Sequence, residues 1–518
     1  MHLQCELSAA LFPLAQGDRL GNLLAAVRAL SDADIQVRQL SRLYESAPAY
    51  VTDQPPFLNA AALVDTALPP LDLLRRLKEV EASLGRNLGP SAQRWGPRPI
   101  DLDIVFFEGQ TVTEGETLVV PHPRWQERDF VKAPLADLCG GGSSSSSSEG
   151  AAKQRPVVAA AAAVGDNAGN NGGSSEEEED EDGSLSSGSS SRAGGDYSGL
   201  QRHLRLAARL WQEAGGERQL GTPDLECVLP MGRLGLWPYQ RRTQIMGILN
   251  ITPDSFSDGG RHAGVAAAVR HAKAMAAAGA DIIDIGGQST RPGSDLLTAE
   301  QEAARVLPVI QALMQEEETA RMPLSIDTFY ADVAAAAVEA GATMVNDVSG
   351  GTMDPRMHRQ VAELGVPYVL MHMRGTPQDM QHRRHTAYSD VIADVAAELT
   401  QAASAAIAAG IEPWRLVLDP GLGFAKTHDG NVALLAGLPA LRAALPPPLA
   451  HLPQLLGPSR KGFLGRLTGR QVAAERDWAT AAAAALCVAG GANIIRAHNV
   501  EAVRDACRVA DAARRFLP

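Results

Sequence analysis

The stretch Met246-Gly-Ile-Leu-Asn-Ile-Thr-Pro-Asp-Ser-Phe-Ser-Asp-Gly-Gly260 decides the fold. It begins as a short apolar run, typical of a buried strand, and the run stops at Asn250, where a polar loop ending in two glycines follows. In α/β proteins, a buried parallel strand that ends in a polar loop is where chemistry is usually placed. The stretch therefore predicts a strand whose carboxyl end carries functional side chains.

The same pattern recurs along the rest of the chain, with Ala-rich helical stretches between the apolar runs. The further runs are Asp281–Gly287, Pro323–Thr328, Met344–Gly350, Pro367–Met373, Leu416–Leu422, Gln454–Arg460 and Asn493–Asn499. Their ends carry residues that an apolar core would not contain, among them Gln288, Arg291, Asp327, Asn346, Asp347, His372, Asp419, Lys461, Arg496 and His498. Eight strands alternating with helices predict a (β/α)8 TIM barrel, whose active site lies at the carboxyl ends of its strands.

Composition excludes several classes of protein. The chain has 518 residues, of which 45% are hydrophobic and 21% charged, and its net charge is −13. The run Glu176–Asp182 is wholly acidic, and there is no basic tract, so we expect no nucleic-acid partner. No apolar run reaches the length of a membrane span, so we expect no membrane partner. The cysteines have no paired spacing, which fits a reducing compartment: Cys5, Cys139, Cys227, Cys487 and Cys507.

Four segments are predicted. Residues 1–138 form an α+β unit, with helices at Gly21–Leu30 and Pro70–Leu84 and strands at Gln36–Glu45, Phe57–Thr66 and Ile100–Phe107. Residues 139–198 are a Gly-, Ser- and acid-rich linker that cannot bury enough apolar surface to order itself. Residues 199–240 form a bridging segment packed on the barrel, and residues 241–518 form the barrel.

The run Arg94-Trp-Gly-Pro-Arg-Pro-Ile-Asp-Leu-Asp-Ile-Val-Phe-Phe107 forms the first chemical constellation. If it is a strand, Asp101 and Asp103 point to the same face, about 7 Å apart. Two such carboxylates can hold Mg²⁺ against a polyphosphate. The guanidinium groups of Arg86, Arg94 and Arg98 can neutralise phosphate charge. Phosphoryl transfer needs little more than metal, cations and positioning. The alternative is a solvated edge strand with incidental ion pairs.

Three further motifs accompany this run: Asp53–Ala60, Val120-Pro-His122 and Arg128-Asp-Phe130. Together they make residues 35–138 resemble 6-hydroxymethyl-7,8-dihydropterin pyrophosphokinase. The resemblance implies a ferredoxin-like fold and transfer of pyrophosphate from the co-substrate ATP to the pterin hydroxymethyl group. It further implies that Asp101 and Asp103 bind Mg²⁺ and that Phe57 and Phe130 sandwich the pterin, with Asn59 bonded to it and Glu81 nearby. The triphosphate would lie among Arg86, Arg94, Arg98, His122 and Arg128.

The barrel motifs, taken in order, resemble dihydropteroate synthase over residues 242–518. They are Leu249–Phe256, Gly286–Pro292, Ser325–Thr328, Asn346-Asp347, Met371–Pro377, Asp419–Phe424, Ser459–Gly462 and Arg496-Ala-His498. The resemblance implies condensation of 4-aminobenzoate with the pterin pyrophosphate, through a dissociative step that needs no strong general base. Sulfonamides occupy the aminobenzoate pocket of this family.

The residue types fit this reaction. A flat pterin needs buried polar partners, which Asp327, Asn346 and Asp419 would supply, while Lys461 bonds the opposite edge. The leaving pyrophosphate needs cations, which Arg291, Arg496 and His498 would supply. By resemblance, Asn250 ligates Mg²⁺, and the aminobenzoate pocket is shaped by Thr290, Pro292, Phe256 and Ser459.

Three hypotheses for the whole chain stay open at this point. The favoured one is a bifunctional folate-pathway enzyme of plant or algal type. The second is a monofunctional synthase with a degenerate pterin-binding or scaffolding N-terminal domain, because Pro13-Leu14-Ala15 stand where the resembling family has Gly-Ser-Asn. The third is a non-catalytic sensor. The family resemblance implies a homodimer or higher homo-oligomer through the barrel. No presequence is visible, which leaves cytoplasm or mitochondrion as the location.

Overall fold

A computed structural model of the chain describes residues 6–11, 18–31, 35–48, 53–89, 98–115, 117–139, 198–222, 224–251, 260–289, 293, 295–514 and 516. For residues 6–11, 198 and 260–262 only the backbone is described. Several predictions lie outside these residues: the linker except for its two ends, the Pro13-Leu14-Ala15 departure, and the roles of Arg94, Phe256, Thr290, Arg291 and Pro292.

The N-terminal part is built on a four-stranded antiparallel sheet in the order β2-β5-β1-β6. Its strands are β1 (Glu6–Leu11), β2 (Ile35–Leu40), β5 (Ala61–Thr66) and β6 (Asp103–Phe107). Helices α1 (Arg19–Ser31) and α2 (Pro70–Ser83) pack against one face, through a core that includes Leu23, Leu77, Val64 and Ile104. A hairpin of β7 (Val112–Glu114) and β8 (Leu118–Val120) follows β6.

The other face of this sheet is covered by helices from both sides of the linker. Helix α3 (Asp129–Asp137) precedes the linker, and α4 (Ser198–Glu213) follows it. Val131 and Leu135 of α3 and Leu204 of α4 share one core with Leu63 and Val105. Residues 61–64 of β5 alternate between the two cores, as expected for a strand with helices on both faces. In β6, Ile104 and Phe107 belong to the first core and Val105 and Phe106 to the second. The predicted α+β ferredoxin-like unit is thereby confirmed.

A second antiparallel sheet joins the bridging segment to the N-terminal strands. Its order is β10-β9-β3-β4, made of β3 (Leu43–Ser46), β4 (Phe57–Asn59), β9 (Leu225–Pro230) and β10 (Leu236–Pro238). Buried residues of β3 and β9 also share a core with the amino ends of barrel strands, including Met246 and Ile282. The segment after the linker therefore packs on the barrel and completes a sheet of the N-terminal part.

The predicted TIM barrel is confirmed as an eight-stranded parallel sheet in the order β16-β15-β14-β13-β12-β11-β18-β17. A bridge between Leu418 and Gln454 links the two end strands. The strands are β11 (Gln244–Asn250), β12 (Ile282–Gly286), β13 (Leu324–Asp327), β14 (Met344–Asp347), β15 (Tyr368–Met371), β16 (Leu416–Asp419), β17 (Leu455–Leu456) and β18 (Ile494–Ala497).

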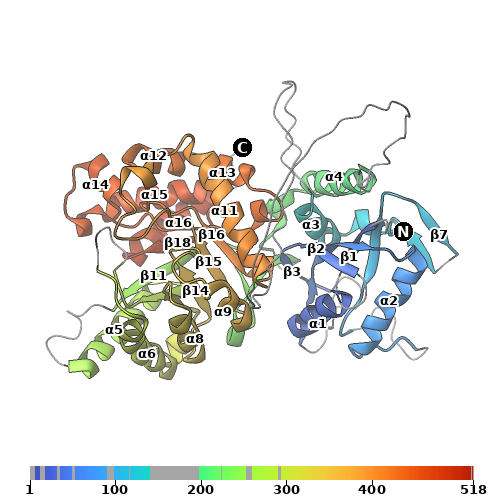
Figure 1. Cartoon of the computed structure of the whole chain (residues 1–518), viewed down its shortest axis with the longest axis horizontal. Helices are drawn as coiled ribbons and strands as arrows, with labels where there is room; N and C mark the ends of the chain where they lie inside the picture. Colours follow the sequence, from blue (N-terminus) through green and yellow to red (C-terminus); the bar gives the residue numbers. More distant parts are fainter. Residues whose placement is uncertain are drawn as a thin grey trace, which may run out of the picture. The chain divides into compact units, whose positions relative to one another are not determined.

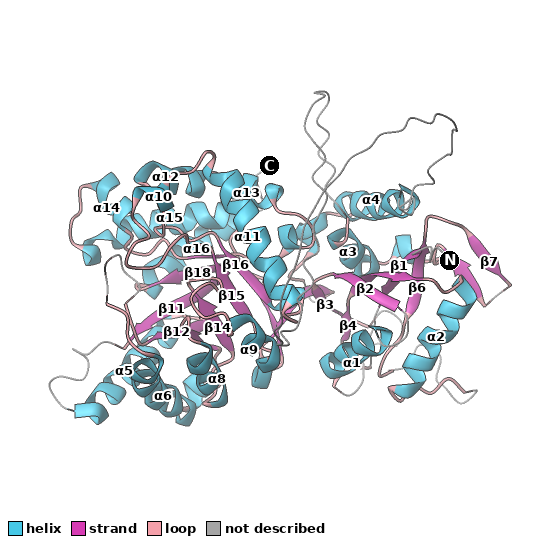
Figure 2. Cartoon of the chain, in the orientation of Figure 1, coloured by secondary structure: helices cyan, strands magenta, loops and turns pink. Residues whose placement is uncertain are grey.

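Helices surround these strands (Figures 1 and 2). They are α5 (Gly260–Ala278), α6 (Ala299–Gln315), α7 (Glu317–Ala320), α8 (Ala331–Glu339), α9 (Met357–Leu364), α10 (Arg383–Thr386), α11 (Val391–Ala408), α12 (His428–Ala436), α13 (Leu438–Ala444), α14 (Gly462–Thr468), α15 (Asp477–Ala489) and α16 (Val500–Arg514). By length and composition alone α11 could cross a membrane. However, its Val395, Leu399 and Ala403 are buried in the barrel core, which explains its apolar character.

The predicted strand boundaries were wrong at three places in the N-terminal part. Gln36–Glu45 is two strands in different sheets, because the chain breaks at Ser41 and Arg42, whose polar groups bond Ala61 and Asp137. Phe57–Thr66 also divides between the two sheets. The strand predicted at Ile100–Phe107 begins at Asp103, so Asp101 lies before the strand and does not follow its alternation. There the backbone of Leu102 bonds the side chains of Lys78 and Glu81.

Candidate active site

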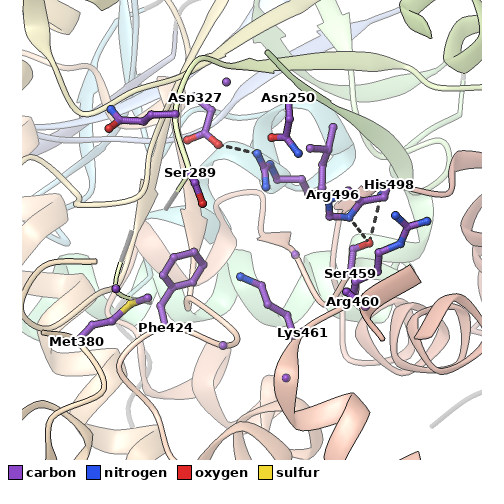
Figure 3. Close-up of a pocket in the computed structure, with 18 of the residues that line it drawn as sticks. Asn250, Ser289, Asp327, Met380, Phe424, Ser459, Arg460, Lys461, Arg496 and His498 are labelled. Atoms are coloured by element: carbon purple, nitrogen blue, oxygen red, sulfur yellow. Dashed lines mark hydrogen bonds and ion pairs between the residues drawn. The ribbon is translucent and has the colours of Figure 1, made fainter. Parts of the chain in front are cut away.

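A cavity of about 1220 Å³ opens at the carboxyl ends of the barrel strands. Its lining includes side chains from several strand ends and from the loops that follow them: Asn250, Ser289, Asp327, Phe424, Ser459, Lys461, Arg496 and His498 (Figure 3). Residues far apart in the sequence thus meet at one end of the barrel, as the sequence predicted.

Arg496, on β18, lies between two carboxylates. Its Nε is 2.6 Å from Asp284 Oδ2, and its Nη2 is 2.6 Å from Asp327 Oδ2 (Figure 3 shows the second pair). The Asn346 amide also donates to Asp284, over 3.1 Å. The Arg496 guanidinium therefore links β18 to β12 and β13, and the Asn346 amide links β14 to β12.

Burial and charge act against each other in this cluster. Burial alone would lower the pKa of Arg496, but Asp284 and Asp327 raise it, so the guanidinium is firmly charged. Burial raises the pKa of Asp327, and the attraction of Arg496 opposes that shift. Paired charges of this kind are costly to separate, because removing one leaves the other buried without a partner.

Sequence reasoning missed Asp284. Its side chain is fully buried, and its Oδ1 has no hydrogen-bond partner among the described residues. The available signal was an ionisable residue inside the apolar run of β12, where a core strand would carry another aliphatic side chain. A buried carboxylate that has an unsatisfied oxygen and is bonded to Arg496 and Asn346 indicates a functional constraint.

Two predicted pterin ligands lie deeper than the cavity wall. Asn346 and Asp419 are 3% and 5% exposed, at the ends of β14 and β16, and neither is among the lining residues. Asp419 Oδ1 accepts from the backbone of Gly421 at 2.7 Å. Burial raises the pKa of Asp419 to about 6, against the opposing effects of this bond and of Lys461.

Lys461 lies across the cavity from Arg496 (Figure 3). Its Nζ is 3.8 Å from the centre of the Phe424 ring, a cation–π contact. Gly423, with φ of +83°, permits this approach, because a Cβ there would lie 2.6 Å from Lys461 Cδ. Close by, Ser459 Oγ and His498 Nδ1 are 2.9 Å apart.

The N-terminal candidate site groups three carboxylates with cations. Asp101 bonds Arg86 and, at 2.7 Å, Arg98. Glu81 is fully buried, 2.8 Å from Lys78 and 2.7 Å from Arg86. Burial raises the pKa of Asp103 to about 6, and the nearby charge of Asp101 adds to the shift.

Among the residues predicted to bind the pterin, Asn59 is a buried amide. Asn59 lies at the end of β4, where its Nδ2 donates to Ser46 Oγ at 2.9 Å, while its Oδ1 has no partner among the described residues. Phe57 and Phe130 are both half-buried, Phe57 on β4 and Phe130 on α3. A buried amide oxygen left without a donor suits an N–H group of a flat heterocycle.

His122 and Arg128, which the sequence predicted beside the triphosphate, come after β6 in the chain. The His122 backbone N–H bonds Val105, and burial, aided by the charge of Arg128, lowers the pKa of the His122 ring. The Arg128 guanidinium lies 5.8 Å from the centre of the Phe130 ring.

The N-terminal site contains oxygen donors of the kind that a magnesium ion takes. Mg²⁺ takes oxygen ligands and commonly uses one or two carboxylates completed by water and phosphate. Asp101 and Asp103 offer this set, and an ion bound there would compete with the nearby cations of Lys78, Arg86 and Arg98. Asp137, Glu217 and His451 also lie close enough together to hold an ion, but the Arg42 guanidinium already bonds both carboxylates at 2.8 and 2.6 Å.

Fold and sites together define a two-part enzyme of pterin chemistry, with a barrel that binds the pterin and an N-terminal domain that handles polyphosphate. Two family models match accordingly: "7,8-dihydro-6-hydroxymethylpterin-pyrophosphokinase" over residues 14–140 and "Pterin binding enzyme" over residues 246–498.

Relatives match almost the whole chain. The mitochondrial folate synthesis bifunctional protein of Pisum sativum is 42% identical over 96% of this chain and 87% of its own length. The folate synthesis bifunctional protein of Arabidopsis thaliana is 39% identical over 96% of this chain and 93% of its own length. The structure of Xanthomonas albilineans dihydropteroate synthase with 4-aminobenzoic acid is 43% identical, with a TM-score of 0.50, over 57% of this chain and 100% of that one.

The chain belongs to the family of bifunctional folate synthesis proteins. It is both a hydroxymethyldihydropterin pyrophosphokinase, with ATP as co-substrate, and a dihydropteroate synthase, as the sequence predicted. Membership over both parts of the chain favours the bifunctional hypothesis over the monofunctional synthase and the sensor.

Asp284 generates the first test. We expect Asp284→Asn, which keeps the shape and removes the charge, to lower the synthase kcat/KM for the pterin pyrophosphate about 30-fold, since a broken buried charge pair costs about 2 kcal/mol or more. Steady-state kinetics measure this. Asp332→Asn, which removes an exposed carboxylate paired with Arg356, is the matched control. Equal kinetics for both variants would contradict the role of Asp284.

Proposed function

We propose that the barrel cavity holds the pterin pyrophosphate and 4-aminobenzoate side by side, with the residue roles that the sequence suggested. Asp327, Asn346, Asp419 and Lys461 bind the pterin. Arg291, Arg496 and His498 receive the pyrophosphate. Thr290, Pro292, Phe256 and Ser459 shape the aminobenzoate pocket, and Phe424 joins them because it faces Lys461 in the same cavity.

One observation carries this proposal: the cavity is lined at once by a carboxylate–guanidinium pair and by a lysine stacked on an aromatic ring. Asp327 accepts hydrogen bonds from a flat ring that carries N–H donors, and Arg496 beside it faces an anion. At about 1220 Å³ the cavity exceeds the roughly 300–1000 Å³ of most single-ligand pockets, which suits two substrates.

The chemistry follows from these charges. As the bond between the pterin methylene and the pyrophosphate oxygen breaks, negative charge gathers on the leaving group, and Arg496 is fixed in place to stabilise it. Asn250, at the end of β11 and on the cavity wall, would hold Mg²⁺, which when bound supplies further charge for the leaving group. Its carboxamide oxygen is the kind of donor this ion takes. The 4-aminobenzoate nitrogen then forms the new C–N bond and releases its proton.

In the N-terminal domain, Phe57, Asn59, Phe130 and Glu81 would hold the pterin. Arg86, Arg94, Arg98, His122 and Arg128 would surround the ATP phosphates, with Asp101 and Asp103 as Mg²⁺ ligands. The Oδ1 of Asn59, which lacks a donor, supports this assignment, as does the pKa of Asp103, which burial and the charge of Asp101 raise and a bound cation would lower.

The two activities can be separated in one chain. We expect the purified protein to make dihydropteroate from hydroxymethyldihydropterin, ATP, Mg²⁺ and 4-aminobenzoate, and also from the ready-made pterin pyrophosphate. Asp103→Asn should abolish only the first route, and Lys461→Met should abolish both while leaving pyrophosphate transfer from ATP intact. A Lys461→Met chain that still condensed the substrates at the original rate would overturn the barrel assignment.

Asp419 gives the synthase a pH dependence. A pterin donates N–H groups, so it binds the ionised carboxylate, which forms above the raised pKa of about 6 and is lost as the pH falls through that value. We therefore expect kcat/KM for the pterin pyrophosphate to fall up to about tenfold per pH unit below pH 6. Profiles of the wild type and Asp419→Asn between pH 5 and 8 test this. The fall in kcat/KM below pH 6 should be smaller in Asp419→Asn than in the wild type, and an unchanged fall would assign it to another group, such as Asp327, whose pKa is also raised.

We also propose that the barrel forms a homodimer or a higher homo-oligomer through the faces of α15 and α16. Trp478 and Leu486 of α15 and Val509 of α16 are 81%, 58% and 72% exposed. The two helices pack on each other, so these exposed apolar side chains lie on neighbouring helices. Exposed apolar patches of this kind mark interaction sites.

This surface gives the fourth test. Trp478→Glu with Leu486→Glu should convert the oligomer to a monomer in size-exclusion chromatography with light scattering, because charge at a buried interface opposes association. Leu88→Glu, at an exposed leucine in the N-terminal part, is the control. A wild-type chain that already ran as a monomer would refute the proposal.

The location proposed is a reducing compartment, the mitochondrion or the cytoplasm. The cysteines Cys227, Cys487 and Cys507 are free thiols, and two plant relatives carry the word mitochondrial in their names.

A further inference from the structure

A buried lysine lies under the loop that joins β16 to α12. Lys426 is 3% exposed, although lysine is seldom buried without partners. Its Nζ donates to the carbonyl oxygens of Gly421 at 3.0 Å and Phe424 at 3.1 Å, and it lies 3.1 Å from His372 Nδ1. Burial lowers the pKa of Lys426 to about 7, and in its charged form the group has three N–H donors, all of which these acceptors use.

The third acceptor fixes the state of His372. Because Nδ1 accepts from Lys426, the ring is neutral, and its proton is on Nε2, which donates to Glu398 at 2.9 Å. Burial, followed by the charge of Lys426, lowers the pKa of His372 to about 4, in agreement with a neutral ring. His372 therefore supports Lys426 and is not exposed to the reaction.

Glu398 is held in turn by Arg374. The Arg374 Nε lies 2.9 and 3.0 Å from the two carboxylate oxygens. The Arg374 guanidinium stacks 3.9 Å from the centre of the Tyr388 ring, and the Tyr388 hydroxyl donates to Ala425 O at 2.9 Å. The chain of contacts thus begins at Lys426 and returns to the neighbouring residue of the same loop.

The loop held in this way begins at Asp419 and carries Phe424. It lies tightly against β15: Gly421 has φ of +71°, and a Cβ there would lie 2.1 Å from the carbonyl oxygen of His372. Asp419 also bonds the Gly421 backbone. The carbonyls of Gly421 and Phe424, the glycine at 421 and the carboxylate of Asp419 therefore set the path of the loop. The loop leads from Asp419, the proposed pterin ligand, to Phe424, on the proposed aminobenzoate side.

We propose that Lys426 is a positioning residue of the synthase, which fixes the 420–426 loop so that Asp419 and Phe424 meet the two substrates together, with His372, Glu398 and Arg374 as its support. The inference rests on the roles proposed above for Asp419 and Phe424. Lys426 lines the cavity, but its donors point at the loop and His372.

Lys426→Met keeps the length of the side chain and removes its donors. We expect the KM for 4-aminobenzoate and the Kd of a pterin, followed by fluorescence, each to rise about tenfold, with kcat changed less than threefold. Glu398→Gln, whose side chain is 35% exposed, removes the charge that holds His372 and should shift the same constants in the same direction by a smaller factor. Lys273→Met, on the outer surface of α5, is the control.

The pyrophosphokinase rate of each variant, measured on the same sample, reports whether the chain is folded. Glu398→Gln carries the test alone if Lys426→Met does not fold. Unchanged KM and Kd with a lower melting temperature would make Lys426 a plain structural lysine. A loss of kcat with unchanged KM and Kd would place it in the chemical step. Either outcome overturns the proposal, whereas a wild type that binds pterin without condensing it would overturn the proposed function instead.

Discussion

The arrangement of the synthase site depends on one guanidinium held between two buried carboxylates. Arg496 bonds Asp284 and Asp327, and Asn346 bonds Asp284, so the ends of β12, β13, β14 and β18 are tied by charge as well as by the barrel's backbone ladder. Charges buried in this way are retained only when each has a partner. This pairing also suits the reaction, because Arg496 is already held in place by Asp284 and Asp327. A cation fixed in this way needs no rearrangement when negative charge develops on a leaving group.

The N-terminal domain depends on residues that follow the linker. Helix α4 covers one face of its main sheet, and β9 pairs with β3 in its second sheet. At the junction, Arg42 is buried with Asp137 and also bonds Glu217 from the bridging segment. The pyrophosphokinase part of this chain is therefore not a self-contained unit that ends before the linker, because its apolar sheet face and one of its strand edges are completed by residues 198–238.

Periodicity made the barrel and its strand ends predictable, since buried parallel strands are continuous apolar runs and the polar residues after them are conspicuous. Motif resemblance then supplied Asp101, Lys461 and Arg496 as site residues. The strand breaks at Ser41 and before Asp103 were not predictable, because they are set by side chains distant in sequence: Asp137 for Arg42, and Lys78 and Glu81 for Leu102. Asp284 was missed for a related reason, since it lies inside an apolar run and only its partner on β18 explains its charge.

His372 and Lys426 show the same limit more sharply. In the sequence, His372 follows a strand, as catalytic residues in barrels do, and Lys426 lies in a glycine-rich loop, as phosphate ligands do. Their geometry gives both a different task. The ring nitrogens of His372 are occupied by Lys426 and Glu398, and the lysine donors are occupied by loop carbonyls. A polar residue at a strand end or in a glycine-rich loop can thus be held entirely by other protein groups, which only the three-dimensional contacts reveal.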